Sequence, residues 1–104
     1  MVVIEWLKFR VAAEVREFFI QKDEAIWTTM LGKYPGFLGK EVWLSPDPRE
    51  LVIIVRWETK EDWDAIPQDA LEETEQKFAI AMNSAYDLIE TGEYQVRKFL
   101  HHGI

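Results

Sequence analysis

The sequence predicts an α+β protein with a ferredoxin-like βαββαβ order and a four-stranded antiparallel sheet. Three observations support this fold class. Turn signals separate short apolar runs, two longer segments repeat apolar residues every three or four positions, and the two kinds of segment follow the order strand, helix, strand, strand, helix, strand. At 104 residues, without a linker or repeat, the chain is expected to form a single domain over residues 1–104.

The first strand and the first helix are predicted within the first third of the chain. The apolar run Val2–Arg10 predicts the strand, and the segment Ala13–Leu31 predicts the helix. Gly32 is placed to end that helix, because glycine adopts the conformation of a helix C-terminus without strain. The apolar residues of the helix, mostly three and four positions apart, are Val15, Phe18, Phe19, Ile26, Trp27 and Met30.

The middle of the chain predicts two strands joined by a proline-containing loop. Tyr34–Gly36 is a Pro-Gly turn signal, and Phe37–Leu44 follows it as a strand rich in residues that favour a sheet. Pro46 and Pro48 end this strand, because neither proline can donate a ladder hydrogen bond. The next strand, Leu51–Trp57, is apolar over almost its whole length.

The last third predicts two helices and a final strand. Thr59 is an N-cap candidate for a short helix that begins at Lys60, since its hydroxyl can accept from a free backbone amide. A second helix is predicted over Pro67–Ser84, with proline in its first turn. A turn at Thr91–Gly92 is then predicted to lead into the fourth strand, Tyr94–Leu100.

Two stretches of this sequence, YPGFLGKEVW and LVIIVRWETKEDW, carry a resemblance to a known superfamily. They resemble the antibiotic-biosynthesis monooxygenase-like proteins, and within them a small uncharacterised cyanobacterial branch. The resemblance covers most of the chain and implies a ferredoxin-like fold that dimerises into an α+β barrel. It implies no single reaction, because the superfamily holds proteins of different activity and fold does not fix function.

The strands also predict a homodimer on physical grounds. Leu51–Val55 is apolar on both faces of its strand, and Val2–Phe9 carries apolar residues on both faces as well. The two predicted helices can cover one face of the sheet, so a second copy of the sheet is expected on the other. A monomer whose loops and C-terminal tail cap that face is the alternative.

Composition narrows the classes of partner and the compartment. The formal charge of −7 disfavours nucleic acid and anionic membranes as partners, since both repel an acidic surface. The chain has no cysteine, which excludes disulfides and thiolate metal sites. Residues 1–10 lack the pattern of a secretory signal and no apolar run is long enough to cross a membrane, so a cytoplasmic location is expected.

Glu5 is the candidate catalytic residue. It is the acidic residue on a strand face shared with Val3, Leu7 and Phe9, where partial burial is expected to raise its pKa and to suit it to proton transfer. In the heme-degrading relatives an asparagine stands at the similar position. The alternative is a structural ion pair between Glu5 and Arg10, Arg56, Arg97 or a lysine across the sheet or the dimer.

The ligand-pocket candidates are Glu5, Trp27, Tyr34, Trp63 and Asn83. Glu5 is included for its place on the strand face. The resemblance implies the other four, because the cofactor-independent oxygenases of the superfamily hold an aromatic substrate beside Trp, Tyr, Asn and Arg. Trp57, Tyr86 and Arg97 lie in similar regions. Ordinary core packing is the alternative for the aromatic residues.

No cofactor and no metal are expected. The heme-degrading relatives use a histidine of the second helix as iron ligand, but the corresponding segment 72–77 is EETEQK. His101 and His102 follow the fourth strand, and two adjacent histidines without a third ligand make a poor metal site.

Three functions therefore stay open, in decreasing order of preference. The first is binding of a small hydrophobic or aromatic ligand without an assigned reaction. The second is cofactor-independent oxygenation of a phenolic or quinol-like compound. The third, heme binding or degradation, is disfavoured by the missing histidine. The sequence does not decide whether the protein is an enzyme.

Overall fold

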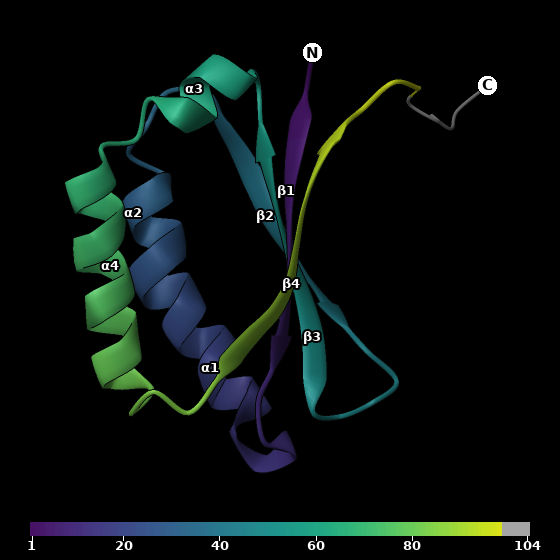
Figure 1. Cartoon of the computed structure of the whole chain (residues 1–104), viewed down its shortest axis with the longest axis vertical. Coiled ribbons are helices and arrows are strands. Elements are labelled where there is room, and N and C mark those ends of the chain that lie inside the picture. Colours follow the sequence, from purple (N-terminus) through teal and green to yellow (C-terminus); the bar gives the residue numbers. More distant parts are fainter. Residues whose placement is uncertain (99–104) are drawn as a thin grey trace.

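The computed structural model describes residues 1–98 and contains one antiparallel sheet with all its helices on one face (Figure 1). The strands lie in the order β2-β3-β1-β4. Their bounds are β1 Val3–Arg10, β2 Phe37–Leu44, β3 Glu50–Trp57 and β4 Asp87–Gln95. This arrangement confirms the predicted ferredoxin-like α+β fold class.

The predicted first helix extends over the expected residues but changes its hydrogen-bonding pattern along its length. It consists of η1 Ala13–Val15, α1 Arg16–Asp23, the π-helical segment η2 Glu24–Thr28 and α2 Thr29–Leu31. Gly32 follows its last residue, as predicted, although its φ of −63° is in the right-handed helical region and not the left-handed one. The two later helices are α3 Lys60–Asp64 and α4 Gln68–Ala81.

The core lies between the sheet and the two long helices. Its centre is aromatic: Phe19 of α1 packs edge-on against Phe78 of α4, with ring centroids 5.1 Å apart. The largest fully buried side chains on this side of the sheet are Trp57, Phe19, Phe78, Leu51, Ile53, Val3 and Val55. This packing fixes both helices over the sheet and determines how much space is left between them.

The Pro-Gly turn before β2 is tied to the start of α3. Thr59 caps α3 as predicted, because its hydroxyl accepts from the backbone N–H of Asp62 at 3.0 Å. Gly36 has φ +86°, and a Cβ there would lie 2.3 Å from a carboxylate oxygen of Asp62. Only glycine fits this position, because it adopts a positive φ without strain and leaves room for the Asp62 side chain.

The fourth strand lies earlier in the chain than predicted. Thr91 and Gly92 do not form a turn; they pair with Leu7 and Trp6 in the middle of β4. Glycine is tolerated here because the ring of Tyr94 takes the space of a side chain, 2.8 Å from where a Cβ would stand. Predicted strand residues 99 and 100 lie outside the described residues.

The second helix ends earlier than predicted. α4 stops at Ala81 rather than near Ser84, because Asn83 and Ser84 adopt φ of 53° and 55°, which lies in the left-handed region. The early stop lets residues 83–86 turn back toward the sheet, and it allows β4 to begin at Asp87. Within residues 1–98, no helix has the length and hydrophobicity to cross a membrane.

Candidate functional site

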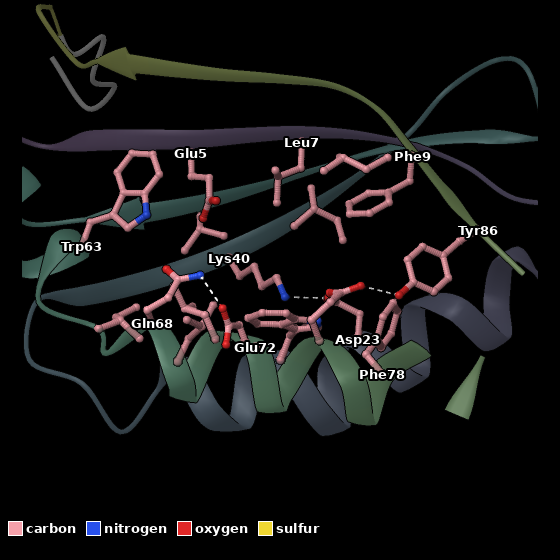
Figure 2. A pocket seen from close by; sticks show the side chains of 18 residues that line it. Glu5, Leu7, Phe9, Asp23, Lys40, Trp63, Gln68, Glu72, Phe78 and Tyr86 are labelled. Atoms are coloured by element: carbon pink, nitrogen blue, oxygen red, sulfur yellow. Dashed lines mark hydrogen bonds and ion pairs between the residues drawn. The ribbon is translucent and has the colours of Figure 1, made fainter. Parts of the chain in front are cut away.

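A cavity of about 560 Å³ lies between the inner face of the sheet and the helices (Figure 2). Leu7, Ile53 and Val55 form its floor on the sheet. Its aromatic lining is Phe9, Trp27, Trp63, Phe78 and Tyr86. Exposed residues of α4 and β4 form its rim, among them Glu72, Glu75 and Leu88. The cavity is therefore an apolar chamber that opens to solvent beside an acidic edge.

One row of residues paired across the strands of the cavity floor contains two charged side chains. Lys40 of β2 and Glu5 of β1 both pair with Val55 of β3, so the two charged residues stand on either side of one apolar residue. The neighbouring row across the same three strands, Val42, Ile53 and Leu7, is apolar. Alternation along the strands directs both rows toward the helices. The sheet thus presents one acidic and one basic residue to the cavity, on a surface that is otherwise apolar.

Glu5 reaches into the cavity without a direct protein partner. Burial raises the pKa of its carboxyl above the ordinary value, while the charges of Lys40 and then Lys60 oppose that rise. Among residues 1–98, nothing forms a hydrogen bond or ion pair with this carboxylate. Arg10 instead contacts Glu50 at 2.7 Å, and Arg56 contacts Glu41 at 3.2 Å.

Lys40 forms a buried ion pair on the other side of the cavity. Its Nζ lies 2.6 Å from Oδ2 of Asp23 on α1, and each side chain is only 7% exposed. Burial raises the pKa of the Asp23 carboxyl, and the Lys40 ammonium, by charge and by hydrogen bond, limits that rise. Figure 2 shows the Lys40 side chain running from the sheet across the cavity to Asp23. The pair therefore fixes an ammonium group inside the chamber.

The π-helical segment lies directly after Asp23. Residues Glu24–Thr28 form η2, and Thr29 Oγ1 donates to the carbonyl of Glu24, five residues earlier, at 3.3 Å. Asp23, Trp27 and Leu31, which are spaced four residues apart, all line the cavity. π-Helical turns are rare and are found frequently at functional sites. This one brings the partner of Lys40 and an aromatic wall residue to the same side of the helix.

The helix α4 supplies the polar groups at the open side. Gln68 donates to Glu72 at 3.3 Å, and the hydroxyl of Tyr86 donates to Glu75 in a short hydrogen bond. Burial, followed by the Glu75 contact, raises the pKa of Tyr86 above its ordinary value. Tyr86 is consequently a neutral hydrogen-bond donor at physiological pH, and the rim stays acidic.

Three of the five predicted pocket residues meet in this cavity. Glu5, Trp27 and Trp63 line it, although they come from β1, η2 and α3. Tyr34 instead packs against the core beside the Pro-Gly turn. Asn83 is exposed just beyond the end of α4. The catalytic role of Glu5 stays a prediction.

Sequence reasoning missed the ion pair that dominates the cavity. Asp23 and Lys40 each occur in segments that read as amphipathic, where a charged residue is usually solvated. One signal was available for Lys40: two positions separate it from Val42 on the same strand, so the two share a face. Asp23 offered a similar signal, since it lies four residues from Phe19 and four from Trp27 and so shares their face of the helix.

The structure shows no group of three metal-ligating side chains within residues 1–98. His101 and His102, predicted to form an exposed tail, lie outside the described residues. The polar groups that face the cavity, namely carboxylates, one ammonium, one amide and one phenol, can hold an aromatic molecule by hydrogen bonds and can exchange a proton with it.

Comparison with known proteins assigns the chain to a family. The family model described as antibiotic biosynthesis monooxygenase matches residues 2–69, and the protein belongs to this family. Among curated proteins, none matches the chain. This match confirms the resemblance seen in the sequence. The cyanobacterial branch stays a prediction.

Solved structures support the same fold. SnoaB, a cofactor-independent oxygenase from Streptomyces nogalater, has 19% identity and a TM-score of 0.67, with 97% of this chain and 98% of that chain covered. A monooxygenase from the gene ActVA-Orf6 of Streptomyces coelicolor, in complex with nanaomycin D, has 14% identity and a TM-score of 0.74, with 97% and 92% covered. A conserved protein from Methanosarcina mazei has 15% identity and a TM-score of 0.67, with 91% and 92% covered.

Proposed function

We propose that this protein binds a small aromatic ligand in the cavity between its sheet and helices. The observation that carries the proposal is the cavity itself, with a volume of about 560 Å³ and five aromatic side chains in its wall. Ligand sites usually measure about 300–1,000 Å³ and combine apolar walls with a few placed polar groups. Glu5 and Lys40 supply these polar groups on the floor, and Trp27 and Trp63 supply flat apolar contact surface.

We also propose that the protein acts as a homodimer in the cytoplasm. The even-numbered residues of β1 and β3 face away from the helices, and Ile4, Trp6 and Val52 of this face are half-buried. Trp43 and Tyr94 on the same face are 46% and 59% exposed. An aromatic and aliphatic centre of this kind favours burial against a second copy. The absence of cysteine from the sequence suits a reducing compartment.

Cofactor-independent oxygenation of a phenolic or quinol-like compound is the second candidate. The raised pKa of Glu5 favours it, because a carboxylate that holds its proton more tightly is a better base. In such a reaction an activated CH₂ group of the substrate becomes a carbonyl with one atom of dioxygen, and the second atom leaves as water. The substrate itself supplies the four electrons, so no cofactor has to take part.

Tryptophan fluorescence tests ligand binding. We expect 1-naphthol to quench the emission of Trp27 and Trp63 with one site per chain. Leu71→Trp places a large ring in the cavity wall and should abolish the titration. Ile80→Trp is the matched control, since it lies on the same helix but is 75% exposed. Undiminished binding by the folded Leu71→Trp variant would show that the ligand does not occupy the cavity.

Oxygen uptake separates the binding protein from the oxygenase. Anthrone carries the activated CH₂ group that the second candidate requires. An oxygenase should consume one dioxygen per anthrone, and Glu5→Gln should lower that rate while naphthol binding persists. If the wild-type protein binds naphthol but leaves the uncatalysed rate of anthrone oxidation unchanged, the binding function stands and oxygenation of this substrate class is wrong.

A further inference from the structure

We propose that Lys40, held by Asp23, is an oxyanion site: it stabilises the ionised hydroxyl oxygen of an aromatic ligand whose proton passes to Glu5. The inference rests on the proposed ligand-binding function and specifies the chemical class of the ligand, an aromatic molecule with an acidic hydroxyl group. It assigns roles to Lys40 and Asp23 that the catalytic candidate Glu5 does not by itself imply.

The sheet register supplies the geometry. Lys40 and Glu5 stand on the two strands that flank Val55, so their Cα atoms are two strand spacings apart, or about 10 Å. Both side chains are long and point to the helix side of the sheet, as Figure 2 shows. The charge of Lys40 acts on the Glu5 carboxyl, so a hydroxyl oxygen of a ring placed over Val55 lies between the carboxylate and the ammonium group.

Lys40 has hydrogen-bonding capacity that the protein leaves unused. Its ammonium group carries three N–H donors, and Asp23 accepts one of them at 2.6 Å. No other ion-pair or hydrogen-bond partner of this group occurs in residues 1–98. A buried donor without an acceptor costs free energy, and here the side chain is 7% exposed. An oxygen atom of a ligand in the cavity can accept the remaining bonds.

Asp23 acts as the positioning residue. β2 is an edge strand of the sheet, and a lysine on an edge strand usually extends its ammonium group into solvent. The carboxylate of Asp23 draws Lys40 inward instead. Without Asp23 the oxyanion site would lose its orientation.

The proton transfer conserves charge inside the cavity. The ligand O–H bond breaks, the proton forms an O–H bond with a carboxylate oxygen of Glu5, and the electron pair stays on the ligand oxygen beside Lys40. Glu72 and Glu75 at the rim repel an anion that arrives from solvent. The cavity therefore suits a neutral phenol that ionises after it has bound, and it disfavours an aromatic carboxylate.

Four probes of nearly equal shape test the inference. They are 4-nitrophenol, its methyl ether 4-nitroanisole, 4-nitroaniline and 4-nitrobenzoate. We expect 4-nitrophenol to bind about tenfold more tightly than the ether, because the ether cannot place an anionic oxygen beside Lys40. The visible band of 4-nitrophenolate then reports ionisation of the bound phenol directly.

The variants isolate the ion pair. Lys40→Met alone leaves Asp23 unpaired and is expected to fold poorly, so the decisive variant is Asp23→Leu with Lys40→Met, which replaces both charges by apolar groups. The apparent pKa of bound 4-nitrophenol should be about 1–3 units lower in the wild-type protein than in the double variant, as expected for an opposite charge at short range. Lys40→Arg should preserve most of this difference.

The ionisable side chains that line the cavity around the bound phenol are Glu5, Asp23, Lys40, Glu72, Glu75 and Tyr86. Glu5→Gln should reduce the band of the ionised phenol at low pH, because the proton acceptor is gone. Equal binding of 4-nitrophenol and 4-nitroanisole, or tighter binding of 4-nitroaniline or 4-nitrobenzoate, would overturn the oxyanion site and leave the ligand cavity standing. If no probe binds the wild-type protein, the ligand site itself is wrong and the oxyanion site with it.

Discussion

The two faces of the sheet use charge in opposite ways. On the inner face, Glu5 and the Asp23–Lys40 pair lie within an apolar cavity and have few protein partners. On the outer face, Arg56 pairs with Glu41, and both Lys8 and Arg10 pair with Glu50. These outer pairs lie beside an apolar group of residues that includes Trp6, Trp43 and Ile54. The charged groups of the inner face are enclosed in the cavity, and those of the outer face are paired with one another.

This difference indicates two kinds of binding surface. An apolar centre with a paired, hydrated rim is the usual composition of a protein interface, in which burial of the centre supplies the free energy. Incompletely partnered charges inside a cavity cost stability, and they recur where a ligand or a reaction requires them. Side chains alternate along each strand, so the odd positions of β1 and β3 can line the ligand cavity while the even positions form the outer face.

The largest expected effect follows from breaking the buried pair on the inner face. Lys40→Met should lower the free energy of unfolding by about 3–5 kcal/mol, because it leaves the Asp23 carboxylate buried without its cation. Combining it with Asp23→Leu should restore most of that loss. Urea denaturation of the three proteins measures both values. A single variant as stable as the wild-type protein would mean that Asp23 is well solvated.

On the outer face, Trp43→Asp is expected to break the homodimer. A buried tryptophan at an interface commonly contributes 2 kcal/mol or more, on the order of a thirtyfold change in the dissociation constant. Light scattering at micromolar concentration should give twice the chain mass of 12.3 kDa for the wild-type protein and the single mass for the variant. Ile80→Asp, at an exposed position of α4, should stay dimeric. A wild-type protein of 12.3 kDa would refute the dimer.

The pH dependence of stability should distinguish Glu5 from the outer carboxylates. Its pKa is raised on folding, so the native state binds more protons than the unfolded state above the ordinary value of 4.5. The contribution of Glu5 to the free energy of unfolding therefore falls as pH rises above 4.5. Glu41 and Glu50 have lowered pKa values and contribute in the opposite sense, so their stabilisation is lost as pH falls.

Glu5→Gln should remove this loss and make the protein more stable than the wild type at neutral pH, with less difference at low pH. Thermal unfolding of both proteins between pH 3 and pH 8 gives the comparison. A variant that is less stable at neutral pH would indicate a cation that pairs with Glu5, which is the structural alternative predicted from the sequence.

The smallest expected effect concerns an ion pair outside both faces. Lys77 and Glu73 are four residues apart on α4, and their side chains are 67% and 69% exposed. Glu73→Ala should change the free energy of unfolding by about 0.3–0.5 kcal/mol. A loss comparable with that of Lys40→Met would mean that burial does not explain the difference between the two pairs.

The sequence predicted the fold better than the site for a physical reason. Strand alternation, helical spacing and the Thr59 cap are local features, and they gave the element order and the face on which Glu5 lies. The position of β4 was misjudged because glycine in a strand resembles a turn until the ring of Tyr94 is seen to cover it.

The Asp23–Lys40 contact joins residues from different elements, and a π-helical segment follows it directly. Its formation depends on how α1 packs over β2, and no local pattern of residues encodes that packing. Of the four residues predicted from the resemblance, Trp27 and Trp63 line the cavity and Tyr34 and Asn83 do not.

The five tryptophan indole N–H groups test the central claim directly, because each reports on one region of the protein. Trp27 and Trp63 line the cavity, Trp6 and Trp43 lie on the outer face, and Trp57 is buried in the core. We predict that titration of ¹⁵N-labelled protein with 1-naphthol shifts the indole resonances of Trp27 and Trp63 and leaves those of Trp6 and Trp43 unchanged. Shifts confined to Trp6 and Trp43 would contradict the account, since the aromatic ligand would then bind the outer face of the sheet.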